Sequence, residues 1–168
     1  MSQLALFQSA RQCVPDDEWY TPDHVLTPVR EALGGTIAWD LASCSLANKR
    51  VKAEKFFSLE NPFQDNHQSE PWQDSFWANP PFTQMAEFAA IVASYSKKRG
   101  VLLANANTSV EWFHTLANDC DSMGLTKGRI SFLSPNRGTG SNRTGQVLFF
   151  WNVDEKLFKN LCTLIKVC

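Results

Sequence analysis

Residues 76–106 read FWANPPFTQMAEFAAIVASYSKKRGVLLANA, and this stretch decides the fold. It opens on a short apolar run and closes on a second one, residues 101–106. Between them lie apolar residues at helical spacing: Met85, Phe88, Ala89 and Val92. Short continuous apolar runs are typical of strands covered on both faces. A strand, a helix and a second strand in this order predict an α/β protein with a parallel sheet.

Upstream of this unit the pattern predicts a helix and two strands. The helix carries apolar residues on one face: Val25, Leu26, Val29, Ala32 and Leu33. Gly34-Gly35 end this helix. Pro28 either kinks the helix or lies in the first turn of a helix that begins only there, because proline cannot donate a hydrogen bond to the preceding turn. Residues 36–41 form a strand, and a second strand ends at Phe56-Phe57. Residues 58–73 are expected to be loop.

Downstream of the unit we expect a helix, a hairpin and a closing helix. The first helix carries Trp112, Phe113, Leu116 and Ala117. Residues 129–133 and 146–151 are β-like and flank the Gly-rich and Asn-rich segment 134–145, which predicts an antiparallel hairpin with a long tip. The closing helix uses Leu157, Phe158, Leu161, Leu164 and Ile165. Together these elements predict a mixed sheet with helices on both faces.

Composition limits the class of protein without naming a partner. The chain has 168 residues, 43% of them hydrophobic, and a net charge of −1, so any basic footprint for nucleic acid must be local. It has no run near the about 18 apolar residues that cross a membrane and no export signal at its start. The five cysteines are odd in number and form no Cys-x-x-Cys pair, which favours reduced thiols and a cytoplasmic location. Among the histidines and cysteines, which are possible metal ligands, only His114 and Cys120 lie near each other in the sequence, so no metal site is expected.

The motif Asn79-Pro80-Pro81-Phe82 stands between a predicted strand and a helix, where open α/β sheets place their binding crevice. Asn79 and Pro80 each precede a proline and are held extended, and neither proline has an N–H, so the loop presents acceptors. An amino group such as that of adenine could donate one hydrogen to the Asn79 carboxamide and one to the Pro80 carbonyl, with Phe82 stacked on the ring. This grip would free the nitrogen lone pair for attack on an electrophilic carbon. The motif alone is equally compatible with a rigid turn.

The sequence resembles the amino-group methyltransferases that use S-adenosylmethionine, whose motif Asp/Asn/Ser-Pro-Pro-Tyr/Phe/Trp is matched by Asn79 to Phe82. More narrowly, it is similar to the small phage and prophage DNA N6-adenine methyltransferases. The shared features, in chain order, are Glu18-Trp19-Tyr20-Thr21-Pro22, Asp40-Leu41-Ala42-Ser43, Asn48, Phe56-Phe57 and Trp77 to Phe82. The resemblance runs from about residue 18 through the terminal hairpin.

This resemblance implies a single Rossmann-like methyltransferase domain over residues 18–168, preceded by a mobile segment, residues 1–17. It implies methylation of adenine N6 in double-stranded DNA in a bacterial cytoplasm, with no obligate protein partner inferred. Related motifs also serve cytosine N4, RNA adenine and protein glutamine, and these acceptors remain alternatives. A third class of reading is a non-catalytic nucleic-acid-binding domain, because the glycine-rich turn that usually follows the first strand is missing here.

The resemblance also implies roles for single residues. The catalytic set is Asn79, Pro80, Pro81 and Phe82. The cofactor set is Tyr20, Thr21 and Pro22 at the methionine end, Asp40 beside the cation, and small Ala42 where a glycine usually stands. Glu60, after the second strand, is the candidate for the cofactor's ribose or adenine. A helix cap at Thr21-Pro22, a turn at Asp40 and an exposed loop at Glu60 are the structural alternatives.

The DNA-binding residues are expected near the hairpin. Arg129, Arg137 and Arg143 lie in or beside a segment rich in Gly, Ser, Thr and Asn that suits a groove. The other candidates, which are less favoured, are Lys97, Lys98 and Arg99 at the end of a helix, and Lys127. Because adenine in a duplex hides its amino group, the base must be flipped out, at a cost of a few kcal/mol.

Overall fold

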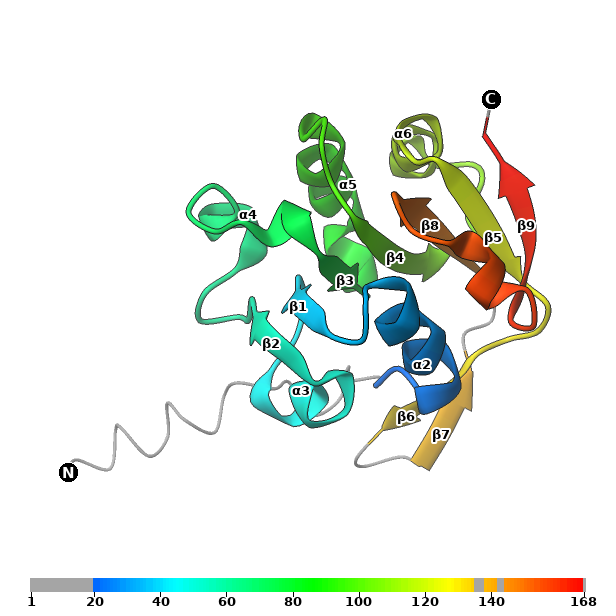
Figure 1. Cartoon of the computed structure of the whole chain (residues 1–168), viewed down its shortest axis with the longest axis horizontal. Coiled ribbons are helices and arrows are strands. Elements are labelled where there is room, and N and C mark those ends of the chain that lie inside the picture. Colours follow the sequence, from blue (N-terminus) through cyan, green and yellow to red (C-terminus); the bar gives the residue numbers. More distant parts are fainter. Residues whose placement is uncertain (1–19, 135–137, 142–143, 168) are drawn as a thin grey trace.

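The computed structural model describes residues 20–134, 138–141 and 144–167 (Figure 1). Its centre is a seven-stranded sheet in the order β2-β1-β3-β4-β8-β5-β9. The strands are β1 Ile37–Asp40, β2 Ala53–Phe56, β3 Phe76–Ala78, β4 Gly100–Asn105, β5 Ser122–Thr126, β8 Gln146–Trp151 and β9 Cys162–Lys166. Strands β6 (Ser131–Ser134) and β7 (Gly138–Ser141) pair separately and form a two-stranded ribbon. The expected N-terminal segment, residues 1–17, lies outside the described residues.

The sheet is mixed, as the sequence predicts. Strands β2, β1, β3 and β4 are parallel, β8 is antiparallel to both β4 and β5, and β9 is antiparallel to β5. From β1 the chain first passes to β2 on one side and then returns to β3 on the other side. The gap between the carboxyl ends of β1 and β3 is therefore a topological switch point, where open α/β sheets bind ligands.

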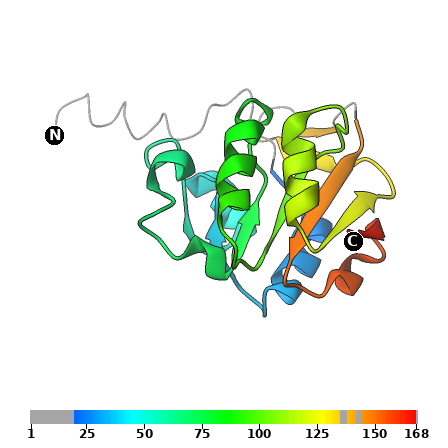
Figure 2. The ribbon, with the colours of Figure 1, turned by 90° about the horizontal axis from the view of Figure 1, so that it is seen from above.

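Helices cover both faces of this sheet (Figure 2). The helices are α2 Asp23–Ala32, α3 Ser45–Val51, α4 Phe63–Asn66, α5 Met85–Ser94 and α6 Glu111–Asp119, with short 3-10 turns η1 Trp72–Asp74, η2 Phe82–Gln84 and η3 Glu155–Phe158. Helices α5 and α6 pack into one core, and α2 and η3 pack into the other. Pro28 lies inside α2, so the alternative in which the helix begins at Pro28 is wrong.

The central strands contribute alternate residues to these two cores. In β8, Phe149 and Trp151 enter the core under α5 and α6, whereas Leu148 and Phe150 enter the core under α2. Every residue of β8 is buried. The continuous apolar runs in the sequence therefore correspond to strands with helices on both sides, which is the reason they show no polar alternation.

The predicted closing helix is wrong. Residues 155–158 form the turn η3, and the chain then continues as the edge strand β9, paired with β5. Cys162 is buried and Leu164 packs against the same core, while Thr163 between them is exposed. Pairing with β9 satisfies the backbone groups along the free side of β5, a strand that the sequence pattern did not indicate.

The predicted hairpin between residues 129–133 and 146–151 is also wrong. Strand β6 turns back onto β7, with Phe132 opposite Gly140, and Gly138 has the positive φ of 74° that suits glycine. Strand β8 instead lies between β4 and β5. A strand buried along its whole length needs partners on both edges and helices on both faces, which a hairpin outside the body cannot supply.

The segment expected to be loop, residues 58–73, is partly helical. The expected loop 58–73 contains the short helix α4 and the start of η1, and Phe63 and Trp72 are buried there. Within the described residues, no helix has the length and apolar character needed to span a membrane.

Candidate active site

A small pocket lies at the switch point between β1 and β3. It encloses about 40 Å³ and is lined by Tyr20, Thr21, Asp40, Ala42, Ala47, Val51, Trp77 and Asn79. The structure therefore brings the expected acceptor, Asn79, together with most of the expected cofactor residues. Ligand pockets usually enclose about 300–1,000 Å³, so this one fits one small end of a molecule.

Asp40 ends β1 and gives the pocket a buried carboxyl group. It is 1% exposed, and its Oδ1 accepts a hydrogen bond from the Ala42 amide at 3.2 Å. Burial raises the pKa of Asp40 to about 7, and the Ala42 amide only partly opposes this effect. A cation in the pocket would favour the charged form of Asp40.

Asn79 directly follows β3 and reaches across the pocket. Its Nδ2 donates to Thr21 Oγ1 at 3.3 Å, a contact between residues 58 positions apart in the chain. Pro80 is buried, whereas Pro81 and Phe82 are exposed, and Phe82 is 53% exposed. The loop thus anchors its first half in the body and leaves an aromatic ring accessible to a partner.

Tyr20 and Thr21 form the pocket wall opposite Asn79. Tyr20 exchanges two backbone hydrogen bonds with Leu133 of β6, at 2.7 and 3.0 Å, so the ribbon is joined to this wall. Pro22 is buried as the N-cap residue of α2, and its carbonyl accepts from Val25 and Leu26. The helix-cap alternative therefore falls on Pro22 and its carbonyl rather than on the Thr21 hydroxyl.

The remaining predicted residues lie elsewhere. Glu60 follows β2 in an exposed turn and is not among the residues that line the pocket. Arg129 is exposed just before β6. Arg137 and Arg143 lie outside the described residues.

Sequence reasoning missed the part of the pocket that α3 supplies. Ala47 and Val51 are one helical turn apart, and this spacing was the available signal for α3. Asn48, one of the shared features, lies on the same helix: its Nδ2 donates to the Ala53 carbonyl at 3.0 Å and its Oδ1 accepts from the Ala53 amide at 2.9 Å. Asn48 thereby ties the end of α3 to the start of β2.

Cys44 is the N-cap residue of α3, and its Sγ accepts a hydrogen bond from the Ala47 amide at 3.4 Å. Cys120 and Cys162 are free and buried, which agrees with the expectation of reduced thiols for these two residues. Burial raises the pKa of the Cys120 thiol to about 12, so this thiol remains protonated and unreactive.

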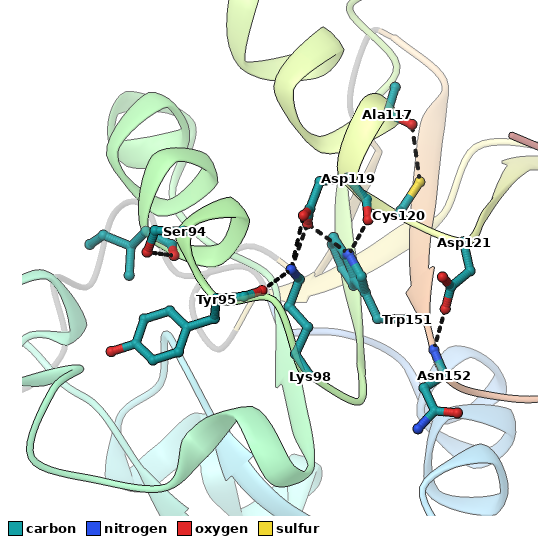
Figure 3. Close-up of polar contacts among 10 residues, drawn as sticks. Ser94, Tyr95, Lys98, Ala117, Asp119, Cys120, Asp121, Trp151 and Asn152 are labelled. Carbon is teal, nitrogen blue, oxygen red and sulfur yellow. Dashed lines mark hydrogen bonds and ion pairs between the residues drawn. The ribbon is translucent and has the colours of Figure 1, made fainter. Parts of the chain in front are cut away.

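A larger hollow lies at the opposite end of the central strands, where β4 begins and β8 ends. Figure 3 shows the polar contacts among the residues there. The Lys98 amino group there contacts the Tyr95 carbonyl and both oxygens of Asp119, at 3.0 and 2.8 Å, and Asp119 accepts from Trp151 Nε1 at 2.9 Å. The Lys98 side chain is only 2% exposed, so it is not available to a DNA phosphate. These polar groups satisfy one another, and we assign this cluster a structural role.

The fold and the pocket define an α/β protein in which Asn79, at the start of the Asn79–Phe82 loop, and the buried carboxyl group of Asp40 lie together at the switch point. The chain matches the family model described as DNA N-6-adenine-methyltransferase (Dam) over residues 8–165. The chain therefore belongs to this family of transferases, and its substrate is DNA. No curated protein and no solved structure matches the chain.

Proposed function

We propose that this chain is a Rossmann-like methyltransferase that transfers the methyl group of S-adenosylmethionine to adenine N6 at specific sites in double-stranded DNA. The observation that carries the proposal is the pocket itself, in which the acceptor side chain of Asn79 and the carboxyl group of Asp40 lie together at the switch point. One group suits an amino substrate and the other suits a cationic methyl donor.

The pocket residues fit the charged end of such a donor. Asp40 and Thr21 are buried and line the same small cavity, and a buried carboxyl group with a polar neighbourhood suits an ammonium or methylsulfonium group. In the proposed complex Tyr20, Thr21 and Pro22 hold the methionine end, Asp40 faces the cation, and Ala42 permits close approach. Glu60, at the carboxyl side of β2, is proposed for the ribose or adenine. S-Adenosylmethionine supplies the electrophilic methyl carbon when bound.

The substrate base is proposed to enter from the exposed side of the Asn79–Phe82 loop. The flipped adenine stacks on Phe82 and donates its two N6 hydrogens to Asn79 Oδ1 and the Pro80 carbonyl. Asn79 Oδ1 and the Pro80 carbonyl would hold the N6 lone pair toward the methyl group that bound S-adenosylmethionine would supply, and the additional proton on nitrogen would pass to solvent. The chain contributes alignment and acceptors, and the step needs no covalent bond to the protein.

The ribbon formed by β6 and β7 is proposed to contact DNA. A two-stranded β-ribbon fits the major groove of B-DNA, and Arg129 at its base is exposed. Arg137 and Arg143 are predicted to contact DNA together with Arg129. Phosphate contacts by arginine position the protein, whereas contacts to base edges select the sequence.

The reaction is tested by incubating the protein with duplex DNA and methyl-labelled S-adenosylmethionine and then analysing the nucleosides. We expect label in N6-methyldeoxyadenosine. Asn79→Ala should lower the rate at least 100-fold, on the order of the loss of one acceptor to a developing charge, while the unfolding midpoint changes little. Label in N4-methyldeoxycytidine instead, or label taken up by RNA or protein but not by DNA in parallel incubations, would reject the proposed acceptor.

A second candidate, DNA binding without transfer, is favoured by one observation, the small volume of the pocket. Calorimetry distinguishes the two functions. Binding of S-adenosylmethionine, with or without duplex DNA, supports the enzyme, whereas DNA binding with no heat from S-adenosylmethionine under either condition supports the binding domain.

A further inference from the structure

We propose that Thr21 is a positioning residue that orients the side-chain amide of Asn79, so that its oxygen and not its NH₂ group faces the adenine. This inference rests on the proposed function and adds to it a second role for Thr21, separate from cofactor binding. It starts from the hydrogen bond between Asn79 Nδ2 and Thr21 Oγ1 at 3.3 Å.

The orientation of this amide matters because its two ends have opposite chemistry. The oxygen of a carboxamide accepts hydrogen bonds and the nitrogen donates them, although the two ends have nearly the same size. The adenine amino group is itself a donor of two hydrogens. An amide flipped by 180° would direct one donor at another, and the grip on N6 would be lost.

The chain holds Thr21 in a fixed place for this purpose. Thr21 is 4% exposed, precedes Pro22 and is β-branched, so both its backbone and its χ1 angle are restricted. Its neighbour Tyr20 is held by the two backbone hydrogen bonds to Leu133. Pro80 restricts the backbone of Asn79 in the same way. The hydrogen bond therefore joins the Asn79 amide to a rigid point at Thr21 and opposes rotation of the amide.

A hydroxyl group can both donate and accept, so the direction of its own hydrogen decides which end of the amide it holds. Asp40 lines the same pocket, and the carboxylate of the proposed cofactor would add a second acceptor there. When the Thr21 hydrogen points to such an acid, the Thr21 oxygen presents only lone pairs to Asn79. It then accepts from Nδ2, as observed, and Asn79 Oδ1 is directed to the substrate.

A carboxylate at position 79 separates this role from cofactor binding, because its two oxygens are equivalent and need no orientation. We would compare wild type, Thr21→Val, Asn79→Asp and the double variant in single-turnover assays with saturating S-adenosylmethionine and duplex DNA. In the wild-type background, Thr21→Val should slow transfer about tenfold, which is the effect of losing one net hydrogen bond. In the Asn79→Asp background, the same substitution should slow transfer less than about threefold. Thr21→Ser keeps the hydroxyl group and should restore most of the rate.

A binding assay tests the same point without turnover. Two duplexes would carry either adenine or purine, which lacks the amino group, at the base found to be methylated, and would be titrated in the presence of S-adenosylhomocysteine. Wild type should prefer adenine, Thr21→Val should lose this preference, and the double variant should regain it. Thermal unfolding of each variant identifies any that does not fold, and Thr21→Ala, which also removes the hydroxyl group, then takes the place of Thr21→Val.

The outcomes distinguish this inference from the proposed function. If Thr21→Val slows transfer equally in both backgrounds, or keeps the adenine preference, Thr21 acts only on the cofactor and the positioning role is rejected. If wild type binds the cofactor and methylates no adenine, the proposed function fails and the inference fails with it.

Discussion

Asp40 shows at the scale of single residues how the fold sets chemistry. A carboxyl group at the end of an exposed turn would be ionised at neutral pH, but Asp40 is 1% exposed and its pKa is raised to about 7. Near neutral pH it therefore exists in both forms. The same burial that makes it a suitable partner for a cation makes it a cost to the protein without one.

The stability of the protein should consequently depend on pH through Asp40. The folded state binds the Asp40 proton more tightly than the unfolded state, so this group's contribution is fully present below about pH 4 and is lost as pH rises through about 7. Urea unfolding at pH 5 and pH 8 should show Asp40→Asn gaining stability relative to wild type as pH rises. Asp23→Asn, at an exposed position of α2, is the matched control for charge. An equal pH dependence in wild type and Asp40→Asn would contradict the assignment.

At the scale of elements, the Lys98 cluster joins parts of the sheet that are distant in sequence. Lys98 in the loop between α5 and β4 binds Asp119 at the end of α6, and Asp119 binds Trp151 at the end of β8 (Figure 3). The ion pair is nearly enclosed on the lysine side. Removing one partner of such a pair leaves the other charge without compensation.

Lys98→Met should therefore lower the free energy of unfolding by about 3 kcal/mol. Lys55→Met is the matched control, because Lys55 pairs with Glu70 at 3.4 Å with 61% of its side chain exposed. It should cost less than about 1 kcal/mol. Urea denaturation at one pH measures both variants, and a loss in Lys98→Met no larger than in Lys55→Met would show that the cluster is not structural.

At the scale of the whole molecule, a net charge of −1 means that the protein has no general attraction to DNA. Binding must depend on local cations placed on the face that meets the duplex. Arg129 stands at the base of the ribbon, and the ribbon is joined through Leu133 to the pocket wall at Tyr20. This arrangement places the proposed DNA-binding element next to the proposed chemistry.

Arg129→Gln should weaken DNA binding at low salt and reduce the slope of log K against log salt by about 1, the loss of one phosphate contact. Lys97→Gln is the control, because Lys97 is exposed in the loop before β4, at the end of the central strands away from the pocket. Fluorescence anisotropy with a labelled duplex over a range of salt measures both. If Lys97→Gln changes the slope and Arg129→Gln does not, the duplex binds at the end of the sheet where β4 begins and not at the ribbon.

The sequence by itself determined the features that depend on local pattern. The continuous apolar run at residues 101–106 indicated β4, and the apolar residues at helical spacing indicated α5. The prolines of the Asn79–Phe82 motif indicated a rigid loop after a strand, and the motif does follow β3. These signals are local because burial on two faces, helical periodicity and the missing proline N–H are properties of neighbouring residues.

Which segments lie side by side follows from the folded arrangement alone. Strand β8 pairs with β4 and β5 and not with β6, and residues 162–166 form an edge strand because β5 offers them hydrogen bonds. The contact between Asn79 and Thr21 and the burial that shifts the pKa of Asp40 arise in the same way. Such features depend on which distant parts of the chain pair as strands, pack in one core or line one pocket. The spacing of residues along the chain does not indicate these long-range contacts.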